Sequence, residues 1–225
     1  MNQKYTEAFG PEYFEKRTGN DPKRQKSFLS EKKFINKYIC SGKLLDVGCS
    51  TGEFIDVLEW SGEIYGMEIS EYAQSIAEKK GIKFDKNLLN SKNFFDIIIF
   101  RGTIQHIDTP FLYLKKAFES LKPGGFVVFL MTPNTNSIYF KLWNTLPFLA
   151  PELNFYVPSD LDLKNAMQNF GFIFKGIRYP YFDSVYASPI RDHLRFIKKM
   201  FTGRGKFPFW RNSMDVIFQK PTGIV

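Results

Sequence analysis

The sequence predicts an α/β fold in which one mostly parallel sheet carries helices on both faces. Short apolar runs alternate five times with amphipathic stretches over residues 22–131, the run at 94–100 is nearly continuous, and glycine directly follows the first run. Continuous apolar runs suit the centre of a parallel sheet, and such alternation builds parallel sheets with right-handed crossovers. A chain of 225 residues that is 44% hydrophobic can form this fold as one domain with a helical lid and insertions.

The elements up to the central strand follow in a regular order. Asp21 and Pro22 suit a helix N-cap and a first helical residue, which predicts a helix over about 22–40. An apolar run at 43–47 that ends in glycine predicts a buried strand. The elements expected next are a helix around 54–58, a strand at 64–68, a helix around 73–77, a short strand at 82–84 and the strand at 94–100.

The elements after the central strand begin with a second proline-led helix. Thr109–Pro110 starts it by the same cap logic, and the glycine pair in residues 122–125 stops it before a strand at 126–131. Residues 134–158 are rich in aromatics, proline and asparagine without a clear period, which indicates an inserted cap.

The last part of the chain returns to regular patterns. Ser159, with Asp162 three residues later, opens a helix that Gly171 ends. Strands are expected at 172–179 and 214–219. Between them, a basic amphipathic helix carries Ile190, Leu194, Ile197 and Phe201 on one side.

The charge of the chain is uneven. Residues 1–43 carry ten basic and five acidic side chains, residues 44–134 nine and twelve, and residues 135–225 twelve and six, for a net charge of +8. The basic flanks suit an anionic small molecule, nucleic acid or a membrane surface, or are simply solvated. The only two cysteines, Cys40 and Cys49, indicate neither a disulfide framework nor a zinc cluster.

The sequence also bears on location. No apolar run approaches the ~20 residues that span a bilayer, so we expect no membrane insertion. The polar stretch at residues 1–7 lacks the apolar centre of a secretory signal. We therefore expect a cytoplasmic protein.

The turn after the first strand has the form Asp46-x-Gly48-x-Ser50-x-Gly52. Glycine allows positive φ and close approach of a ligand to the backbone, and the N–H groups of the following helix favour a ligand carboxylate. Glu68 ends the second strand, sixteen positions after Gly52, where a carboxylate can bind both ribose hydroxyls. Nicotinamide-dependent dehydrogenases share this arrangement, so these residues alone leave two cofactors open.

The segment 44–52, Leu-Leu-Asp-Val-Gly-Cys-Ser-Thr-Gly, closely resembles the first motif of class I S-adenosylmethionine-dependent methyltransferases, and the dehydrogenase spacing G-x-G-x-x-G is absent. Further similar segments follow in the family's order over about 40–134: the ribose motif at 65–69, the fourth strand at 95–100, the "LEHxxDP" segment at 104–110 and the "LKPGG" turn at 121–125. The resemblance implies a Rossmann-like, mostly parallel seven-stranded sheet with an antiparallel C-terminal strand. The implied parts are an N-terminal helical lid (1–40), a cofactor-binding half (41–134) and a substrate-side half with insertions (135–225).

The resemblance also implies the cofactor, S-adenosyl-L-methionine, with S-adenosyl-L-homocysteine as product, and its contacts. The methionine part would lie against Asp46, Gly48, Cys49, Ser50, Thr51 and Gly52, the ribose against Glu68 and Ile69, the adenine against Asp85, Asn87 and Leu88, and the sulfonium against Arg101, Gly102 and Thr103. In related enzymes an amino-terminal segment closes over the cofactor. Tyr13, Phe14 and Arg24 are candidates for that role here; the alternative is that they lie on a plain surface helix.

Proton removal from a hydroxyl acceptor needs a base, and the chain has two histidines. His106 follows the central strand at the ligand edge of the sheet and is the leading candidate, unless it only braces the loop. The candidates for substrate contact are Gln105, which stands where the family usually has Glu, and Asn134, Tyr181, Asp183 and His193. The acidic residues after Gly125 are scattered, so we expect no metal site.

These residues favour an O-methyltransferase whose acceptor is a small polar metabolite. A sugar or nucleotide-linked sugar is expected, because residues 178–183 and 207–210 loosely resemble methyltransferases of bacterial cell-surface carbohydrate pathways. The basic flanks would suit a phosphate-bearing substrate. The alternatives are an RNA methyltransferase, although no RNA-binding module is recognisable, and a non-catalytic cofactor-binding protein. We expect no DNA partner and a monomer or homodimer.

Overall fold

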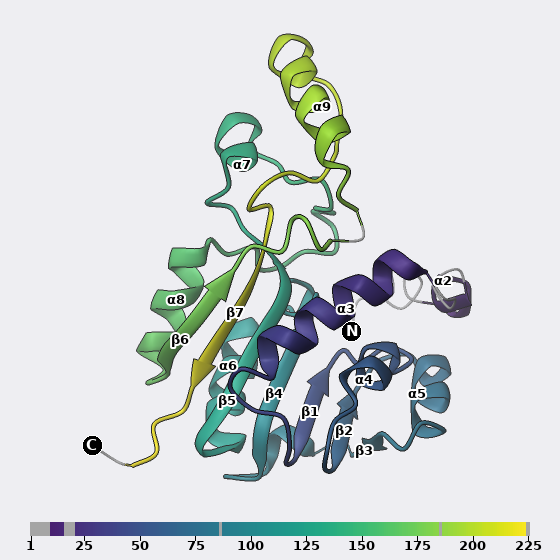
Figure 1. Ribbon diagram of the computed structural model, residues 1–225. Helices are drawn as coiled ribbons and strands as arrows, with labels where there is room; N and C mark the ends of the chain where they lie inside the picture. Colours follow the sequence, from purple (N-terminus) through teal and green to yellow (C-terminus); the bar gives the residue numbers. More distant parts are fainter. Residues whose placement is uncertain (1–9, 16–20, 86, 185, 224–225) are drawn as a thin grey trace.

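The computed structural model describes residues 10–15, 21–85, 87–184 and 186–223. Its centre is one seven-stranded sheet in the order β3-β2-β1-β4-β5-β7-β6 (Figure 1). All the pairings among β1 to β5 are parallel, whereas β7 runs antiparallel to both of its neighbours. The predicted α/β sheet with one antiparallel strand is therefore confirmed.

Each predicted strand is present, but β5 begins five residues before the predicted residue 126, so the residues 122–125 expected as a turn belong to the strand. The bounds of the strands are β1 Leu44–Val47, β2 Ile64–Met67, β3 Lys83–Phe84, β4 Phe95–Arg101, β5 Leu121–Pro133, β6 Ile173–Arg178 and β7 Ser213–Gln219. In register, Val47 lies beside both Met67 and Phe100. The carboxyl ends of β1, β2 and β4 thus lie at one edge of the sheet, where ligands of such folds bind.

The helices connect these strands and extend beyond them. Their bounds are α2 Pro11–Glu15, α3 Pro22–Ile35, α4 Glu53–Leu58, α5 Glu71–Glu78, α6 Pro110–Ser120, α7 Ile138–Trp143, α8 Asp160–Asn169 and α9 Pro189–Thr202, with 3₁₀ turns η1 Leu88–Asn90 and η2 Ile104–His106. The inserted cap predicted at 134–158 contains α7, which its mixed composition did not reveal.

The helix caps follow the sequence with two exceptions. The Asp21 side chain accepts from the Lys23 N–H, and Ser159 forms the predicted capping box with Asp162. The Thr109 side chain accepts no hydrogen bond from the first turn of α6, so the predicted side-chain cap is absent there, and its hydroxyl donates to Asp108. The first long helix, expected over 22–40, ends at Ile35.

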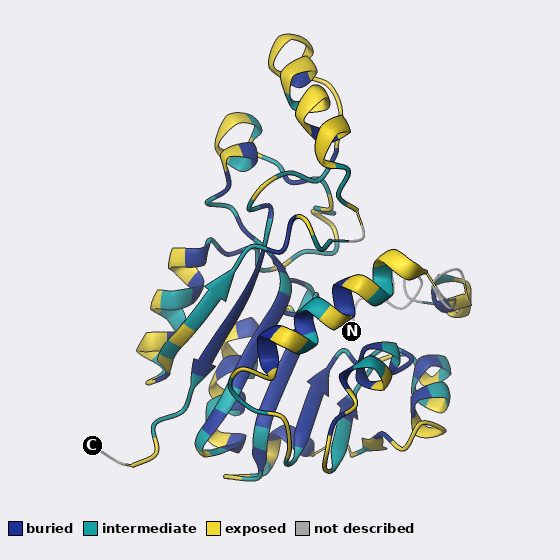
Figure 2. Cartoon of the chain, in the orientation of Figure 1, coloured by how far each residue is buried: buried dark blue, intermediate teal, exposed yellow. Residues whose placement is uncertain are grey.

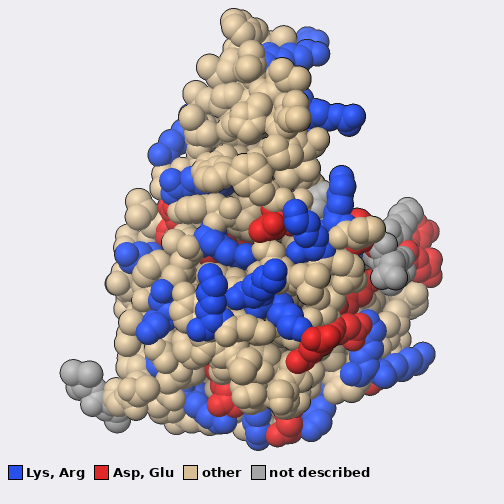
Figure 3. Space-filling view, viewed as in Figure 1, with Lys and Arg blue, Asp and Glu red and all other residues tan. Residues whose placement is uncertain are grey.

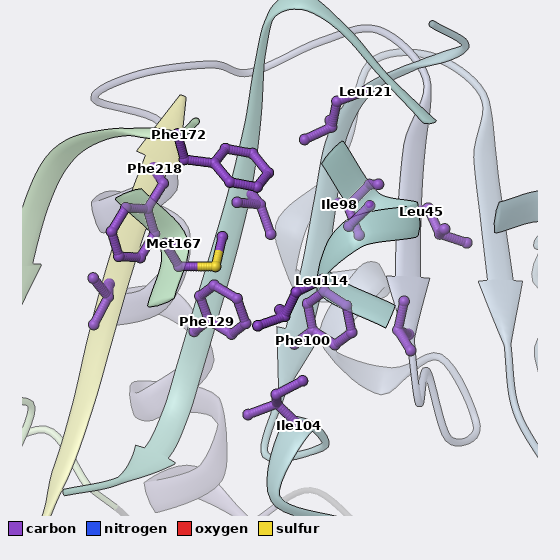
Figure 4. Close-up of a cluster of buried hydrophobic side chains, with 14 of the residues drawn as sticks. Leu45, Ile98, Phe100, Ile104, Leu114, Leu121, Phe129, Met167, Phe172 and Phe218 are labelled. Carbon is purple, nitrogen blue, oxygen red and sulfur yellow. The ribbon is translucent and has the colours of Figure 1, made fainter. Parts of the chain in front are cut away.

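The two faces of the sheet are covered by different helices. On one face, Leu114 of α6 and Met167 of α8 pack against Phe129 of β5 in a cluster drawn in Figure 4. On the other face, Phe28 of α3 and Ile55 of α4 pack against the alternate residues of the strands. The central strands β1 and β4 and most of β5 and β7 are buried on both sides, as a central sheet requires, whereas the edge strands β6 and β3 are partly exposed (Figure 2).

The segments α7 and α9 project beyond the carboxyl edge of the sheet (Figure 1). A small core of their own joins them, built around Tyr139, Leu146 and Phe207 with Trp143 and Phe196 packed against it. None of the helices in the described ranges is both long and apolar enough to cross a membrane.

A buried ion pair fixes α3 over the edge of the sheet. The Arg101 side chain donates through Nε to Glu31 Oε2 at 2.6 Å and through Nη2 to Oε1 at 3.1 Å, and the Glu31 carboxylate is buried. Glu31 shares one face of α3 with Phe28 and Ile35, so that face places a carboxylate inside the molecule. Such a pair holds its two elements together because breaking it leaves a charge buried.

We predict that Glu31→Ala lowers the free energy of unfolding by about 3–5 kcal/mol, because the Arg101 guanidinium loses its partner. Urea denaturation measures this change. The double variant Glu31→Ala/Arg101→Met should recover a large part of the loss. Glu119→Ala removes a surface partner of Lys115 and should cost less than about 1 kcal/mol. A loss for Glu31→Ala no larger than that of Glu119→Ala would contradict the prediction.

Candidate active site

An open cleft of about 1600 Å³ lies at the carboxyl ends of β1, β2 and β4. Its volume exceeds that of a typical pocket for one small ligand, so it has room for a cofactor and an acceptor together. The predicted cofactor and lid residues that line it are Tyr13, Phe14, Arg24, Asp46, Gly48, Cys49, Ser50, Glu68, Ile69, Asp85, Arg101, Gly102 and Thr103, and the predicted substrate-side residues are Gln105, His106 and Tyr181.

The glycine turn after β1 is built for close approach. Gly48 has φ +82°, and a Cβ there would lie 2.4 Å from Thr103 Oγ1 in the segment after β4. The Gly48 N–H donates to the Met67 carbonyl at 2.7 Å. Only glycine combines the positive φ with the absence of a Cβ that this position requires. The turn after β1, the end of β2 and the segment after β4 therefore meet at Gly48.

The Glu68 carboxylate ties the second strand to the same turn. Its Oε2 accepts from the Ser50 N–H at 3.0 Å, while Oε1 accepts from the Ile69 and Ser70 N–H groups at 2.8 and 3.0 Å. Since each carboxylate oxygen has about two acceptor sites, one site remains on Oε2. One ribose hydroxyl can bind there, and binding both would require Glu68 to release a backbone amide.

Asp46 is a buried carboxylate with one unsatisfied hydrogen-bond acceptor. Its Oδ1 has no hydrogen-bond partner in the described part of the chain. Burial raises the pKa of Asp46 to about 7, against the opposing charge of Arg101, and the carboxylates of Glu68 and Glu31 raise it further. A buried acceptor of this kind is costly unless a donor reaches it, so the site fits an ammonium group of a ligand.

His106 faces the cleft from η2 with a defined tautomer. Its Nδ1 lies 2.8 Å from the Leu153 carbonyl oxygen, so Nδ1 carries the proton and Nε2 the lone pair. Burial lowers the pKa of His106, while the bond to Leu153 acts in the opposite direction. The ring is therefore neutral at pH 7 and can accept a proton.

Comparison with known proteins assigns the family. Residues 13–173 match the family described as "Methyltransferase domain". The chain belongs to the class I S-adenosylmethionine-dependent methyltransferases. The structure is similar to that of an S-adenosylmethionine-dependent methyltransferase of Thermotoga maritima, with a TM-score of 0.62 and 20% identity over 88% of this chain and 90% of that one.

Two curated relatives of this methyltransferase match shorter stretches. They are a ubiquinone biosynthesis O-methyltransferase of Ruegeria pomeroyi, 29% identical over 37% of the chain, and a demethylmenaquinone methyltransferase of Lactococcus lactis, 31% identical over 48% of it. The matches span 38% and 51% of those two proteins. The family cofactor, S-adenosylmethionine, fits the observed site through the open Asp46 oxygen and the Gly48 turn.

Several residues predicted for the methyltransferase site lie away from the cleft wall. Leu88 is buried in the core, and Gly52 packs toward Ile82. Asn134 is fully buried, where its side chain accepts from the backbone N–H groups of Asn136 and Asp160. Thr51 is buried, and Asn87 is exposed in the turn before η1. The Asp183 carboxylate accepts a hydrogen bond from Ser30 on α3. His193 is exposed on α9, with its Nδ1 near the Pro189 carbonyl.

Arg101 differs from expectation in its orientation. It lines the cleft, but its guanidinium binds Glu31 and stacks over the Phe28 ring at 4.5 Å. The Arg101 guanidinium also interacts electrostatically with the Asp46 carboxylate, which the sequence motif did not indicate. The sequence did contain one signal for the partner of Arg101, because Glu31 occupies a position among the apolar residues of α3.

The methyltransferase cleft also contains residues that sequence patterns did not single out. Its wall includes Leu146, Phe148, Leu149 and Tyr186. Beside His106, the Gln105 side chain donates through Nε2 to the Gly102 carbonyl, while its buried Oε1 has no partner among the described residues. We call the part of the cleft at Asp46 its polar end. The wall beyond His106, called the apolar end below, combines these apolar side chains with polar ones that include Asn154, Ser184 and Arg211.

We predict that Asp46→Asn stabilises the ligand-free protein at high pH. Because the pKa of Asp46 rises from 3.8 unfolded to about 7 folded, its contribution to stability is complete below pH 3.8 and is lost as pH rises through 7. The neutral amide avoids that loss. The variant should exceed wild type by up to about 4 kcal/mol above pH 7, and the difference should vanish near pH 4. Urea denaturation across this range measures it.

The matched control for this prediction is Glu78→Gln, which removes an exposed carboxylate from α5. It should leave the pH dependence of stability unchanged. An Asp46→Asn difference that stayed constant from pH 4 to pH 8 would show that the Asp46 carboxylate is not strained by burial.

Proposed function

We propose that this protein transfers a methyl group from S-adenosylmethionine to a hydroxyl group of a small molecule that carries an apolar ring. The observation that supports the transfer most directly is His106, whose Nδ1–H bond to the Leu153 carbonyl makes Nε2 the basic nitrogen, 3.4 Å from Gln105 Nε2 at the cleft wall. The cleft joins this histidine to the glycine turn of the cofactor site. The sheet edge, the turn and the histidine form one continuous site.

The residues proposed to hold the cofactor follow from the polar end of the cleft. Asp46 would bind the ammonium group, Gly48 would admit the methionine chain, and Glu68 would bind a ribose hydroxyl through Oε2. Asp85 lies at the same wall and would meet the adenine. The bound cofactor supplies an electrophilic methyl group on a sulfonium.

The acceptor would occupy the apolar end. Phe148 and Tyr186 pack together there with ring centroids 4.6 Å apart, and such rings bind flat apolar groups well. The names of the two curated relatives refer to ubiquinone biosynthesis and to demethylmenaquinone, which supports a ring-bearing acceptor. The sugar acceptor expected from the sequence stays a prediction. The panel of candidate acceptors described below includes sugars and tests it.

The chain's own groups would prepare the hydroxyl for attack. Gln105 Oε1 can accept a hydrogen bond from the acceptor, and His106 Nε2 can accept the proton that leaves the oxygen. Positioning of the acceptor oxygen beside the methyl group would supply much of the remaining rate. His106 itself needs no change of protonation before the acceptor binds, because its ring is already neutral.

We predict that binding of S-adenosylhomocysteine releases a proton below pH 7. Asp46, with a pKa of about 7, must ionise to hold the ligand ammonium, so affinity should fall by up to about tenfold for each pH unit below 7. Calorimetry in buffers of different ionisation heat measures affinity and proton release together. Asp46→Asn should bind weakly, without this pH dependence. NAD that binds as well as S-adenosylhomocysteine would contradict the cofactor assignment.

We predict that His106→Ala lowers kcat/KM by about 10²–10⁴ while S-adenosylhomocysteine affinity stays the same. Methyl-labelled cofactor with a panel of phenols, catechols, sugars, nucleotide sugars and RNA would identify the acceptor. With that acceptor, the acid limb of the wild-type pH profile should lie below pH 6.5, because the pKa of His106 is lowered. Unchanged turnover in the variant would remove His106 as the base, and incorporation into RNA alone would overturn the small-molecule proposal.

A further inference from the structure

The helix α9 has an apolar face that nothing covers in the described structure. Ile190, Leu194, Ile197 and Phe201 recur at helical spacing, and their side chains are 82%, 63%, 56% and 86% exposed. In a soluble domain such a stripe normally faces the core. Figure 2 shows that α9 is exposed over most of its surface at the projecting end of the molecule.

The opposite side of α9 already makes the contacts that hold the helix in place. Phe196 stacks on Phe209 with ring centroids 4.2 Å apart. Asp192 is fully buried and accepts from the Tyr181 hydroxyl, and Lys199 donates to the Gly205 carbonyl. At 100° per residue, these three positions lie nearly opposite the exposed stripe. The packing of the cap therefore directs the apolar stripe away from the protein.

A basic strip borders the stripe. Arg191, Arg195 and Lys198 are exposed on the adjoining face, and Arg204 and Lys206 are exposed just after the helix. The one acidic residue of α9, Asp192, is buried. In the face drawn in Figure 3, Lys and Arg project from this tip, where no Asp or Glu is visible.

We propose that α9 docks this protein on the surface of an anionic lipid bilayer, lying in the interface plane. Exposed apolar residues bordered by Lys and Arg are the features by which such helices bind bilayers. A second copy of the chain is a poorer occupant, because a symmetric contact through the stripe would bring the basic strips of both copies together. The neighbouring helix α7 adds the exposed Ile138 and Leu142 to the same end of the molecule.

This docking would place the cleft close to the bilayer. Phe148 and Tyr186 line the cleft, are themselves largely exposed, and lie in the segments that lead from α7 and into α9. Delivery of an apolar acceptor from the bilayer rests on the proposed function, whereas the docking itself does not. A binding measurement without cofactor or acceptor separates the two.

The test is sedimentation of the full chain with vesicles of phosphatidylcholine, with and without phosphatidylglycerol. Wild type should bind the anionic vesicles, and added salt should weaken binding. Leu194→Glu/Phe201→Glu should abolish it. Arg191→Gln/Lys198→Gln should weaken it by roughly 25-fold, at about fivefold for each charge. Arg195 is left intact because it pairs with the buried Asp192.

Matched controls make the same changes elsewhere. Leu161→Glu alters an exposed leucine on α8, and Lys33→Gln/Lys37→Gln removes two exposed charges on or next to α3. Both should bind vesicles like wild type, and all variants should bind S-adenosylhomocysteine equally, which shows that they fold. Wild type that stays in the supernatant, α9 variants that bind normally, or a dimer that Leu194→Glu/Phe201→Glu dissociates without changing vesicle binding would each overturn the proposal.

Discussion

The ion pair between Glu31 and Arg101 is the contact on which the arrangement of the site depends. It joins α3 to the end of the central strand β4, and Arg101 also lies within electrostatic reach of Asp46. One guanidinium thus balances two buried carboxylates from different parts of the fold. Without it, the cost of burying Asp46 beside the glycine turn would rise further, and α3 would lose its anchor over the cleft.

The cleft owes its two different ends to the structure of the sheet edge. Parallel strands bring their carboxyl ends together. Asp46 at the end of β1, Glu68 directly after β2 and the segment after β4 that leads to His106 therefore line one crevice. The segments around residues 146–149 and 181–186, which follow later in the chain, add apolar side chains to the wall. A charged ligand and an apolar ring can therefore lie side by side.

The cap shows how one helix can serve two purposes. The inner side of α9 fills a small aromatic core, while its outer side leaves an apolar stripe in solvent. A stripe of this kind lowers solubility unless something binds it. Burial of Asp192 leaves only basic charge around the stripe, which suits an anionic surface.

The sequence by itself determined the order of strands and helices, the glycine turn, and the capping box of α8. These depend on periodicity and turn chemistry within a few residues, which any reader of the chain can recognise. Only the tertiary structure decided that Arg101 pairs with Glu31, seventy positions away. It also decided that the buried Asn134 side chain accepts from the Asp160 N–H, and that His106 binds the Leu153 carbonyl. Such contacts form when distant segments pack, and their partners leave no local pattern in the chain.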